Sequence, residues 1–115
     1  MKNSKEPVIV IKNKLDKVCL ENTDKFDAFV TIGLEESGDY HVKIDFQNLS
    51  QSQFKKLVQY SKLNRRLEFS SDIIKQEKYN ITHIVVTDFS ANNLFDVSWN
   101  CLSDDPRLYE GLKGE

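Results

Sequence analysis

The side chains that most often perform chemistry in proteins are few in this chain and widely spaced. Its only histidines are His41 and His83, and its only cysteines are Cys19 and Cys101. Zinc sites draw such residues from short local spacings, and none is present here. Cys101 and His83 could pair as nucleophile and base if they lie on neighbouring strands. We expect instead free, mostly buried thiols, a surface imidazole at His41 and a sheet-face imidazole at His83.

Acidic residues form pairs that could hold a cation or divide acid and base roles. The pairs are Glu35-Glu36, Asp104-Asp105 and the looser Asp24 and Asp27. Neighbours on a turn or strand point in different directions, so we expect solvated turn charges. The chain also lacks the motifs of phosphate loops, dinucleotide sites, zinc proteases, calcium loops and serine hydrolases. The sequence therefore predicts no catalytic residue, no metal site and no cofactor.

Basic residues gather in one segment, between Gln51 and Leu67, which contains no acidic residue. Three of them and one glutamine recur at intervals of four, three and four residues, which places Lys55, Gln59, Lys62 and Arg66 along one side of a helix. A solvated helix face usually mixes Glu with Lys, and this one does not. The stripe could meet an acidic protein surface, follow a phosphate backbone or be a solvated face. The predicted partner-binding residues are Lys55, Lys56, Gln59, Lys62, Arg65 and Arg66.

The composition restricts the classes of protein that the chain can belong to. A formal charge of −2 argues against a polyanionic nucleic-acid mimic and against a strongly basic nucleic-acid binder. A length of 115 residues suits one domain, predicted over residues 1–115 with 1–7 frayed. Neither a signal peptide nor a membrane span is recognisable, so we predict a cytoplasmic location and no membrane partner.

A helix must present the basic stripe, and a strong local signal predicts one. Ser50 and Gln53 have the spacing of a capping box, in which each side chain bonds the other residue's backbone N–H. Apolar residues then recur at helical spacing, which predicts a helix from Gln51 to Lys62 or Leu63. Asn64 is expected to end this helix in the left-handed conformation.

Strands are predicted on both sides of the helix. Apolar residues alternate over 26–34 and 40–46, which predicts an antiparallel hairpin with its turn at 36–39. Ahead of it, 8–11 is a predicted short strand and 12–25 a loop or weak strand. After the helix we predict strands over 67–74, 81–89 and 95–101, the second central and the third placing Trp99 under the helix. Asp105 before Pro106 predicts a short helix to Glu110.

The predicted element order is β-β-β-α-β-β-β-α. We therefore expect an α+β domain of two layers, in which a mainly antiparallel sheet of five or six strands is packed by one central helix and a short C-terminal helix. From Phe26 onward this order resembles that of the profilin and longin type of two-layer fold. The resemblance is one of element order and implies no activity.

These observations favour a non-enzymatic protein that binds another protein. We expect an inhibitor, an immunity or antitoxin-type factor or an adaptor, of bacterial or phage origin, whose partner presents an acidic surface. The alternative is a nucleic-acid-associated accessory protein that uses the same basic helix. A small enzyme is the third hypothesis, and it requires a pocket that joins His83, Asp88 or Cys101 in hydrogen-bonding geometry. Self-association through a sheet edge stays open.

Overall fold

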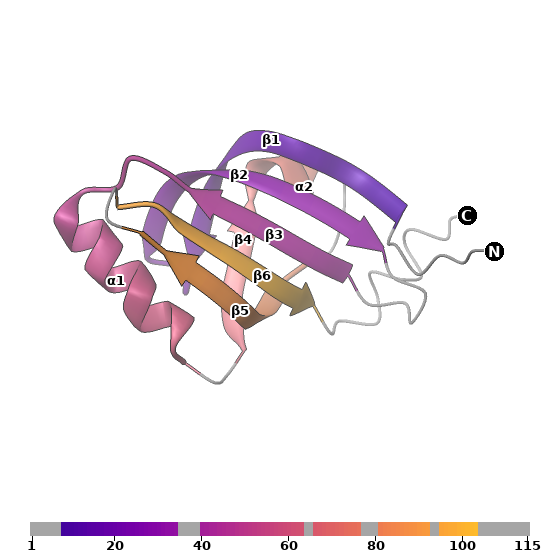
Figure 1. Ribbon diagram of the computed structural model, residues 1–115. Coiled ribbons are helices and arrows are strands. Elements are labelled where there is room, and N and C mark those ends of the chain that lie inside the picture. Colours follow the sequence, from indigo (N-terminus) through magenta and orange to yellow (C-terminus); the bar gives the residue numbers. More distant parts are fainter. Residues whose placement is uncertain (1–7, 35–39, 64–65, 77–80, 93–94, 104–115) are drawn as a thin grey trace.

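Six antiparallel strands close into a barrel, shown as a computed structural model in Figure 1. The structure describes residues 8–34, 40–63, 66–76, 81–92 and 95–103. Around the barrel the strands follow the order β1-β2-β3-β6-β5-β4, and β4 pairs with β1 to complete the circle. The elements are β1 (Val8–Leu20), β2 (Asp24–Leu34), β3 (Tyr40–Phe46), α1 (Gln51–Ser61), β4 (Leu67–Ser71), α2 (Asp72–Gln76), β5 (His83–Ala91) and β6 (Val97–Ser103).

The barrel consists of two three-stranded meanders, β1-β2-β3 and β4-β5-β6, which α1 connects. The hairpin of β2 and β3 confirms the sequence prediction, with Val30 opposite Ile44 in its ladder. Side chains at alternate positions point inward, as the pleat of a strand requires. The largest fully buried side chains belong to Trp99, Tyr40 and Phe46. Phe46 packs edge-on against Trp99, with ring centroids 5.1 Å apart, so aromatic packing joins β3 to β6 inside the barrel.

The predicted open, two-layer sheet is wrong, and with it the resemblance to the profilin and longin type of fold. The error lies in residues 12–25, most of which belong to the long strand β1. In β1 the charged Asp16 is buried, whereas the apolar Leu15 has 62% of its surface exposed. The inward face therefore carries a carboxylate and the outward face a leucine. That inversion hides the alternation by which a strand is recognised in a sequence.

Strand β1 also bends, and the bend lets it close the barrel. Its register with β2 shifts between Ile9 and Ile11 and again between Ile11 and Lys14. Asn13 lies at this bend with φ of 48°, and its backbone N–H donates to Thr31 Oγ1 at 2.9 Å. Bulges of this kind turn a strand and increase its twist. One strand can therefore pair with β2 over its length and with β4 at its last three positions.

Two further predictions placed strand ends wrongly. The strand over 67–74 ends at Ser71, and the next residues form α2. Two side-chain acceptors account for this turn: Asp16 Oδ2 accepts from the Ile73 N–H at 3.0 Å, and Ser71 Oγ accepts from the Ile74 N–H at 3.2 Å. Satisfying these N–H groups within a turn favours the helix over a longer strand. The last two strands also begin two residues later than predicted, with β5 at His83 and β6 at Val97.

The predicted strand over 95–101 implied that Phe95 is a core residue of β6, and this is wrong. It precedes the strand with φ of 61° and is 39% exposed. Its ring packs at 5.1 Å from the ring of Phe54 in α1. Residues 1–7, the predicted turn at 36–39, the stop at Asn64 and the helix from Pro106 to Glu110 lie outside the described residues.

Candidate functional site

Helix α1, which carries the predicted partner-binding stripe, lies against one end of the barrel beside β5 and β6 (Figure 1). The capping box that predicted it is present. The Gln53 N–H donates to Ser50 Oγ at 3.2 Å, and the Ser50 N–H donates to Gln53 Oε1 at 2.9 Å. These bonds satisfy N–H groups that no helical carbonyl can reach. The helix therefore begins where the sequence predicted and ends at Ser61, within two residues of the predicted end.

The inner side of α1 is fixed to the barrel by a buried polar contact. Leu57 and Ser61 are its buried residues. Trp99 Nε1 donates to Ser61 Oγ at 2.6 Å, and Ser61 Oγ donates to the Leu57 carbonyl at 2.7 Å. The prediction that Trp99 lies under the helix is therefore confirmed. Because an indole N–H left unpaired in the core is costly, this contact fixes the rotation of α1 about its own axis. The side of α1 that faces water is fixed by the same contact.

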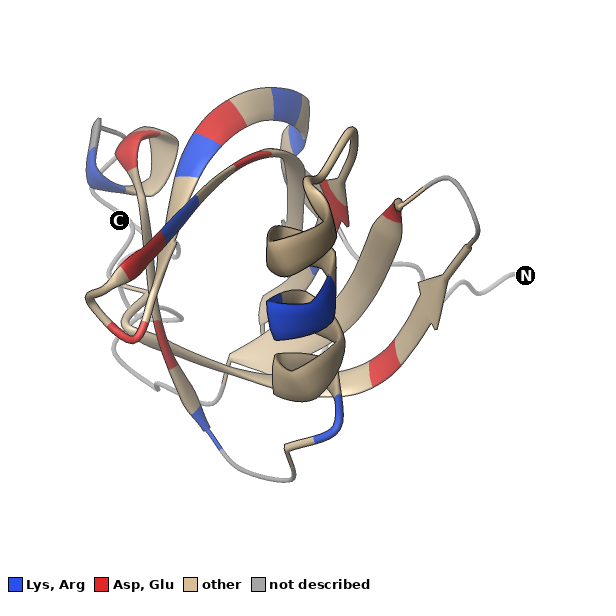
Figure 2. Cartoon of the chain, turned by 90° about the vertical axis from the view of Figure 1, so that its left-hand side faces the viewer, with Lys and Arg blue, Asp and Glu red and all other residues tan. Residues whose placement is uncertain are grey.

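The outer side of α1 presents the predicted stripe. Lys55, Gln59 and Lys62 are exposed. Figure 2 shows basic and no acidic residues along the helix. Arg66 is exposed beyond the helix end and has an interaction of its own, whereas Arg65 lies outside the described residues. The structure thus places the helical part of the stripe on one solvent-facing surface.

Lys56 differs from Lys55, the other lysine of α1, because it contacts the first residue of β2. Its Nζ lies 3.1 Å from Asp24 Oδ1, and Tyr60 Oη donates to Asp24 Oδ2 at 2.5 Å. The hydrogen bond from Tyr60 and the ion pair with Lys56 lower the pKa of the Asp24 carboxyl below its usual value of 3.8. Burial and the bond to Asp24 raise the pKa of Tyr60 to about 12. Lys56 therefore holds α1 in place and is less available to a partner than Lys55.

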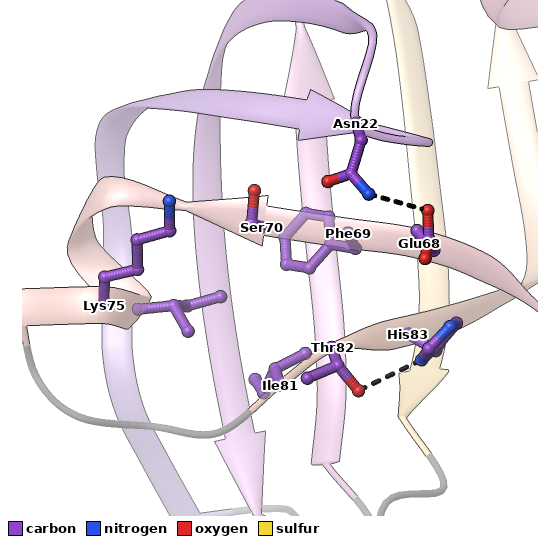
Figure 3. A pocket seen from close by; sticks show the side chains of 9 residues that line it. Asn22, Glu68, Phe69, Ser70, Lys75, Ile81, Thr82 and His83 are labelled. Atoms are coloured by element: carbon purple, nitrogen blue, oxygen red, sulfur yellow. Dashed lines mark hydrogen bonds between the residues drawn. The ribbon is translucent and has the colours of Figure 1, made fainter.

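A groove runs along the outer side of β4, and no pattern in the sequence predicted it. It consists of two adjoining hollows of about 330 and 310 Å³ that share Asn22, Ser70 and Lys75. Figure 3 shows the first hollow, with Lys75 and Ser70 on the side of β4 that faces Asn22. Lys25 of β2 lines the second hollow. These residues come from the β1–β2 turn, β2, β4 and α2, so no local spacing in the sequence could bring them together.

The side chains that the enzyme hypothesis required are not joined. Cys101 is fully buried, and this burial raises the pKa of its thiol to about 12, so the thiolate that attacks a substrate is scarce. His83 lines the groove and its Nδ1 lies 3.0 Å from Thr82 Oγ1. None of the five best-defined hollows among the described residues is lined by His83 together with Asp88 or Cys101.

Neither a metal centre nor a membrane-spanning helix is found in the described ranges. No three His, Cys, Asp or Glu residues there could hold an ion together. None of the helices in those ranges is long and apolar enough to cross a membrane. The two cysteines are both free, as predicted.

Comparison with known proteins finds no family, no curated protein and no solved structure that the chain matches.

Proposed function

We propose that this protein binds another protein, without catalysis, through the outward face of α1. The observation that carries the proposal is the unbalanced charge of this face. Lys55 and Lys62 are exposed, and no carboxylate of the described residues lies within ion-pair distance of either. A partner that presents an acidic surface would supply the missing counter-charges. An inhibitor, an immunity or antitoxin-type factor or an adaptor would act in this way.

The state of the carboxylates supports this proposal. Asp24 and Asp27 are paired with lysines, and Asp45 accepts from Ser98 Oγ at 2.6 Å. The carboxylates of Asp16 and Glu21 accept hydrogen bonds from backbone N–H groups. These five acidic side chains thus satisfy donors of the chain itself, whereas Lys55 and Lys62 have no such partner among the described residues and remain free for an external one.

The way in which α1 is held also supports the proposal. The capping box fixes its first turn, Trp99 fixes its inner side, and Asp24 fixes its edge through Tyr60. A face that is already ordered loses little conformational entropy on binding. Exposed lysines on such a face would mainly accelerate the encounter with an acidic partner, so the association rate should fall as salt is added.

A nucleic acid is the second candidate partner, and one feature favours it. A small hollow of about 140 Å³ places Lys25 of β2 beside Lys56 of α1. Basic side chains therefore extend from the helix towards the groove, as an extended sugar–phosphate backbone would need. Bases would also require aromatic platforms, and Phe95 is the one aromatic among the exposed large hydrophobic residues of the described ranges. We therefore rank this candidate second.

The experiment that tests the proposal compares two double variants with the same change of charge. Tagged wild-type protein, Lys55→Glu with Lys62→Glu, and Lys12→Glu with Lys14→Glu are incubated with lysate of the source cell. Each sample is split into nuclease-treated and untreated halves, and captured proteins are identified by mass spectrometry. The control lysines lie on β1 and are likewise exposed. We expect one protein, captured in stoichiometric amount with or without nuclease, to be lost only with the α1 variant.

The remaining outcomes contradict the proposal in different ways. Capture that disappears with nuclease would favour the nucleic-acid candidate. Equal loss with both double variants would mean that overall charge, and not the α1 face, governs binding. If no protein is enriched by the wild type, the stripe is a solvated face and the proposal fails.

A further inference from the structure

The groove along β4 exists because the barrel is weakly closed there. Strand β4 pairs with β1 at three positions and with β5 at two, whereas β3 pairs with β2 and with β6 at seven positions each. Where ladders are this short, neighbouring backbones diverge and the side chains above them leave space. Each hollow of the groove falls at the lower end of the volume range of small-molecule sites, roughly 300–1,000 Å³. The groove is thus large enough for a small ligand but shallow for a large one.

The part of the groove near α2 is positively charged. Lys17, Lys25 and Lys75 reach it from β1, β2 and α2. Lys17 is neutralised by Asp27, with Nζ 3.1 Å from Oδ1. Within the described ranges no ion pair neutralises Lys25 or Lys75. Asp72 lines the same hollow and reduces its positive charge without reversing the sign.

Neutral hydrogen-bonding groups accompany these lysines. Figure 3 shows the Ser70 hydroxyl and the Lys75 ammonium on the same side of β4. Ser70 lies in both hollows, between Lys75 and Asn22. Two free ammonium groups with a hydroxyl donor among them suit a ligand that carries two negative charges on several oxygens. A phosphoryl group has this character, whereas a single carboxylate has half the charge.

The turn beside the groove is held in a strained conformation. Glu21 and Asn22 have φ of 55° and 60°, a region that residues other than glycine seldom occupy. Three hydrogen bonds to Glu68 hold the turn there. The Glu21 N–H donates to the Glu68 carbonyl at 2.9 Å, and the Glu68 N–H donates to Glu21 Oε2 at 2.6 Å. Asn22 Nδ2 donates to Glu68 Oε1 at 3.0 Å. The Glu68 carboxylate therefore already accepts a hydrogen bond from the side chain of Asn22. The rim of the groove is ordered before any ligand arrives.

From these observations we infer that the groove binds a small phosphorylated molecule, with its phosphoryl group held by Lys25, Lys75 and the Ser70 hydroxyl. The site is separate from the outward face of α1 and does not rest on the proposed function. Its residues come from β2, β4 and α2.

The test is an NMR titration of the full chain, followed through its backbone amide signals. The ligands are pyrophosphate, inorganic phosphate, adenosine monophosphate and, as a ligand without phosphate, adenosine. We expect pyrophosphate and adenosine monophosphate to shift the signals of Ser70, Lys75 and Lys25 at millimolar concentration or below, and adenosine to shift none. Binding should weaken as salt is added, because the attraction is partly screened.

Matched variants connect the signals to the site. Lys25→Gln with Lys75→Gln is expected to weaken pyrophosphate binding by at least about tenfold, because each lysine makes a charge-assisted contact. Lys12→Gln with Lys14→Gln carries the same change of charge on exposed positions of β1 and should leave binding unchanged. Ser70→Ala changes no charge and should weaken binding by a smaller factor. An unchanged spread of amide signals in each variant shows that it is folded.

Three results would overturn the inference. The first is the absence of shifts at Ser70 and Lys75 with pyrophosphate. The second is equal weakening by the two double variants, which would indicate attraction to overall charge. The third is a single-stranded oligonucleotide that shifts signals of α1 while the small phosphates leave the groove unchanged, because the phosphate chemistry would then belong to the helix.

Discussion

Asp24 connects two parts of the molecule that are far apart in the sequence. It is the first residue of β2, and its Oδ2 accepts a hydrogen bond from Tyr60 Oη. Lys56 Nζ lies 3.1 Å from its Oδ1. Asp27, three residues along the same strand, also pairs with a lysine at 3.1 Å. The two pairs differ in exposure: the side chains of Asp27 and Lys17 are 66% and 69% exposed, whereas that of Asp24 is 22% exposed. Equal distances therefore conceal unequal contributions to stability.

This difference yields a prediction for a matched pair of variants. Asp24→Asn is expected to reduce the free energy of unfolding at neutral pH by about 1–3 kcal/mol, because it weakens charge-assisted bonds in a half-buried place. Asp27→Asn is expected to cost less than about 1 kcal/mol, since an exposed pair is screened by water and salt. Urea unfolding, followed through the fluorescence of the single tryptophan, measures both. Equal losses in the two variants would contradict this assignment.

The pH dependence of Asp24→Asn follows from the direction of the pKa shift. The carboxyl pKa is lowered in the folded state, so its contribution is complete above the ordinary value of 3.8. As the pH falls through the lowered pKa, the carboxylate is protonated in both states and the contribution is lost. The difference between wild type and Asp24→Asn should therefore be constant from neutral pH to about pH 5 and shrink towards about pH 3. A difference that grows on acidification would show that the pKa is raised instead.

At the scale of the elements, the bend in β1 is the feature on which closure of the barrel depends. Asn13 takes φ of 48° at the bend, and the residue is exposed, so its conformation can be changed without disturbing the core. Asn13→Val should lower stability by about 1–2 kcal/mol, because a β-branched side chain is disfavoured at positive φ. Asn13→Gly should be neutral or slightly stabilising. Lys12→Val, one position earlier, is the control and should change stability by less than about 0.5 kcal/mol. Thermal unfolding of the three variants tests the order.

The same strand shows what could be predicted from the sequence and what could not. The hairpin of β2 and β3 and the helix α1 were predictable, because regular alternation and a capping box are local signals. The alternation of β1 is interrupted by its bulges and by Asp16, which occupies an inward position where an apolar residue would be expected. Asp16 is buried there because it caps a backbone N–H of α2, a contact between residues 57 positions apart. Without β1 as a full strand, the sheet could not be recognised as closed.

The residues of the candidate sites also differ in whether a local sequence pattern could predict their positions. The exposure of Lys55 and Lys62 was predictable, since both follow from the period of one helix. That Lys56 would pair with Asp24 was not predictable, because this contact depends on how the helix sits against the β1–β2 turn. The groove could not be foreseen at all, because Lys25, Ser70 and Lys75 meet only after the barrel has closed.

At the scale of the whole molecule, the barrel has a strong side and a weak side. The ladders of β3 with β2 and β6 are long, whereas β4 is held by five strand pairings in all, three with β1 and two with β5. The bonds between Glu21 and Glu68 partly compensate for this weakness. Local opening of a protein begins where the fewest contacts must be broken. The seam between β4 and β5, which has the fewest pairings, is therefore the place where this barrel should open first, and the first hollow of the groove lies on that seam.

Native-state hydrogen exchange tests this order of opening. We expect the Phe69 amide, which donates to the Thr82 carbonyl, to exchange faster than the ladder amides of β3 by about an order of magnitude or more. Glu21→Ala removes the side-chain acceptor for the Glu68 N–H and should accelerate exchange in β4 alone, leaving the slow amides of β3 unchanged. Asp27→Ala, which removes a carboxylate from an exposed pair, should leave both groups unchanged. If the β4 amides exchange as slowly as those of β3, or if Glu21→Ala accelerates both equally, the barrel opens only as a unit. The short ladders would then be no measure of where its stability is lowest.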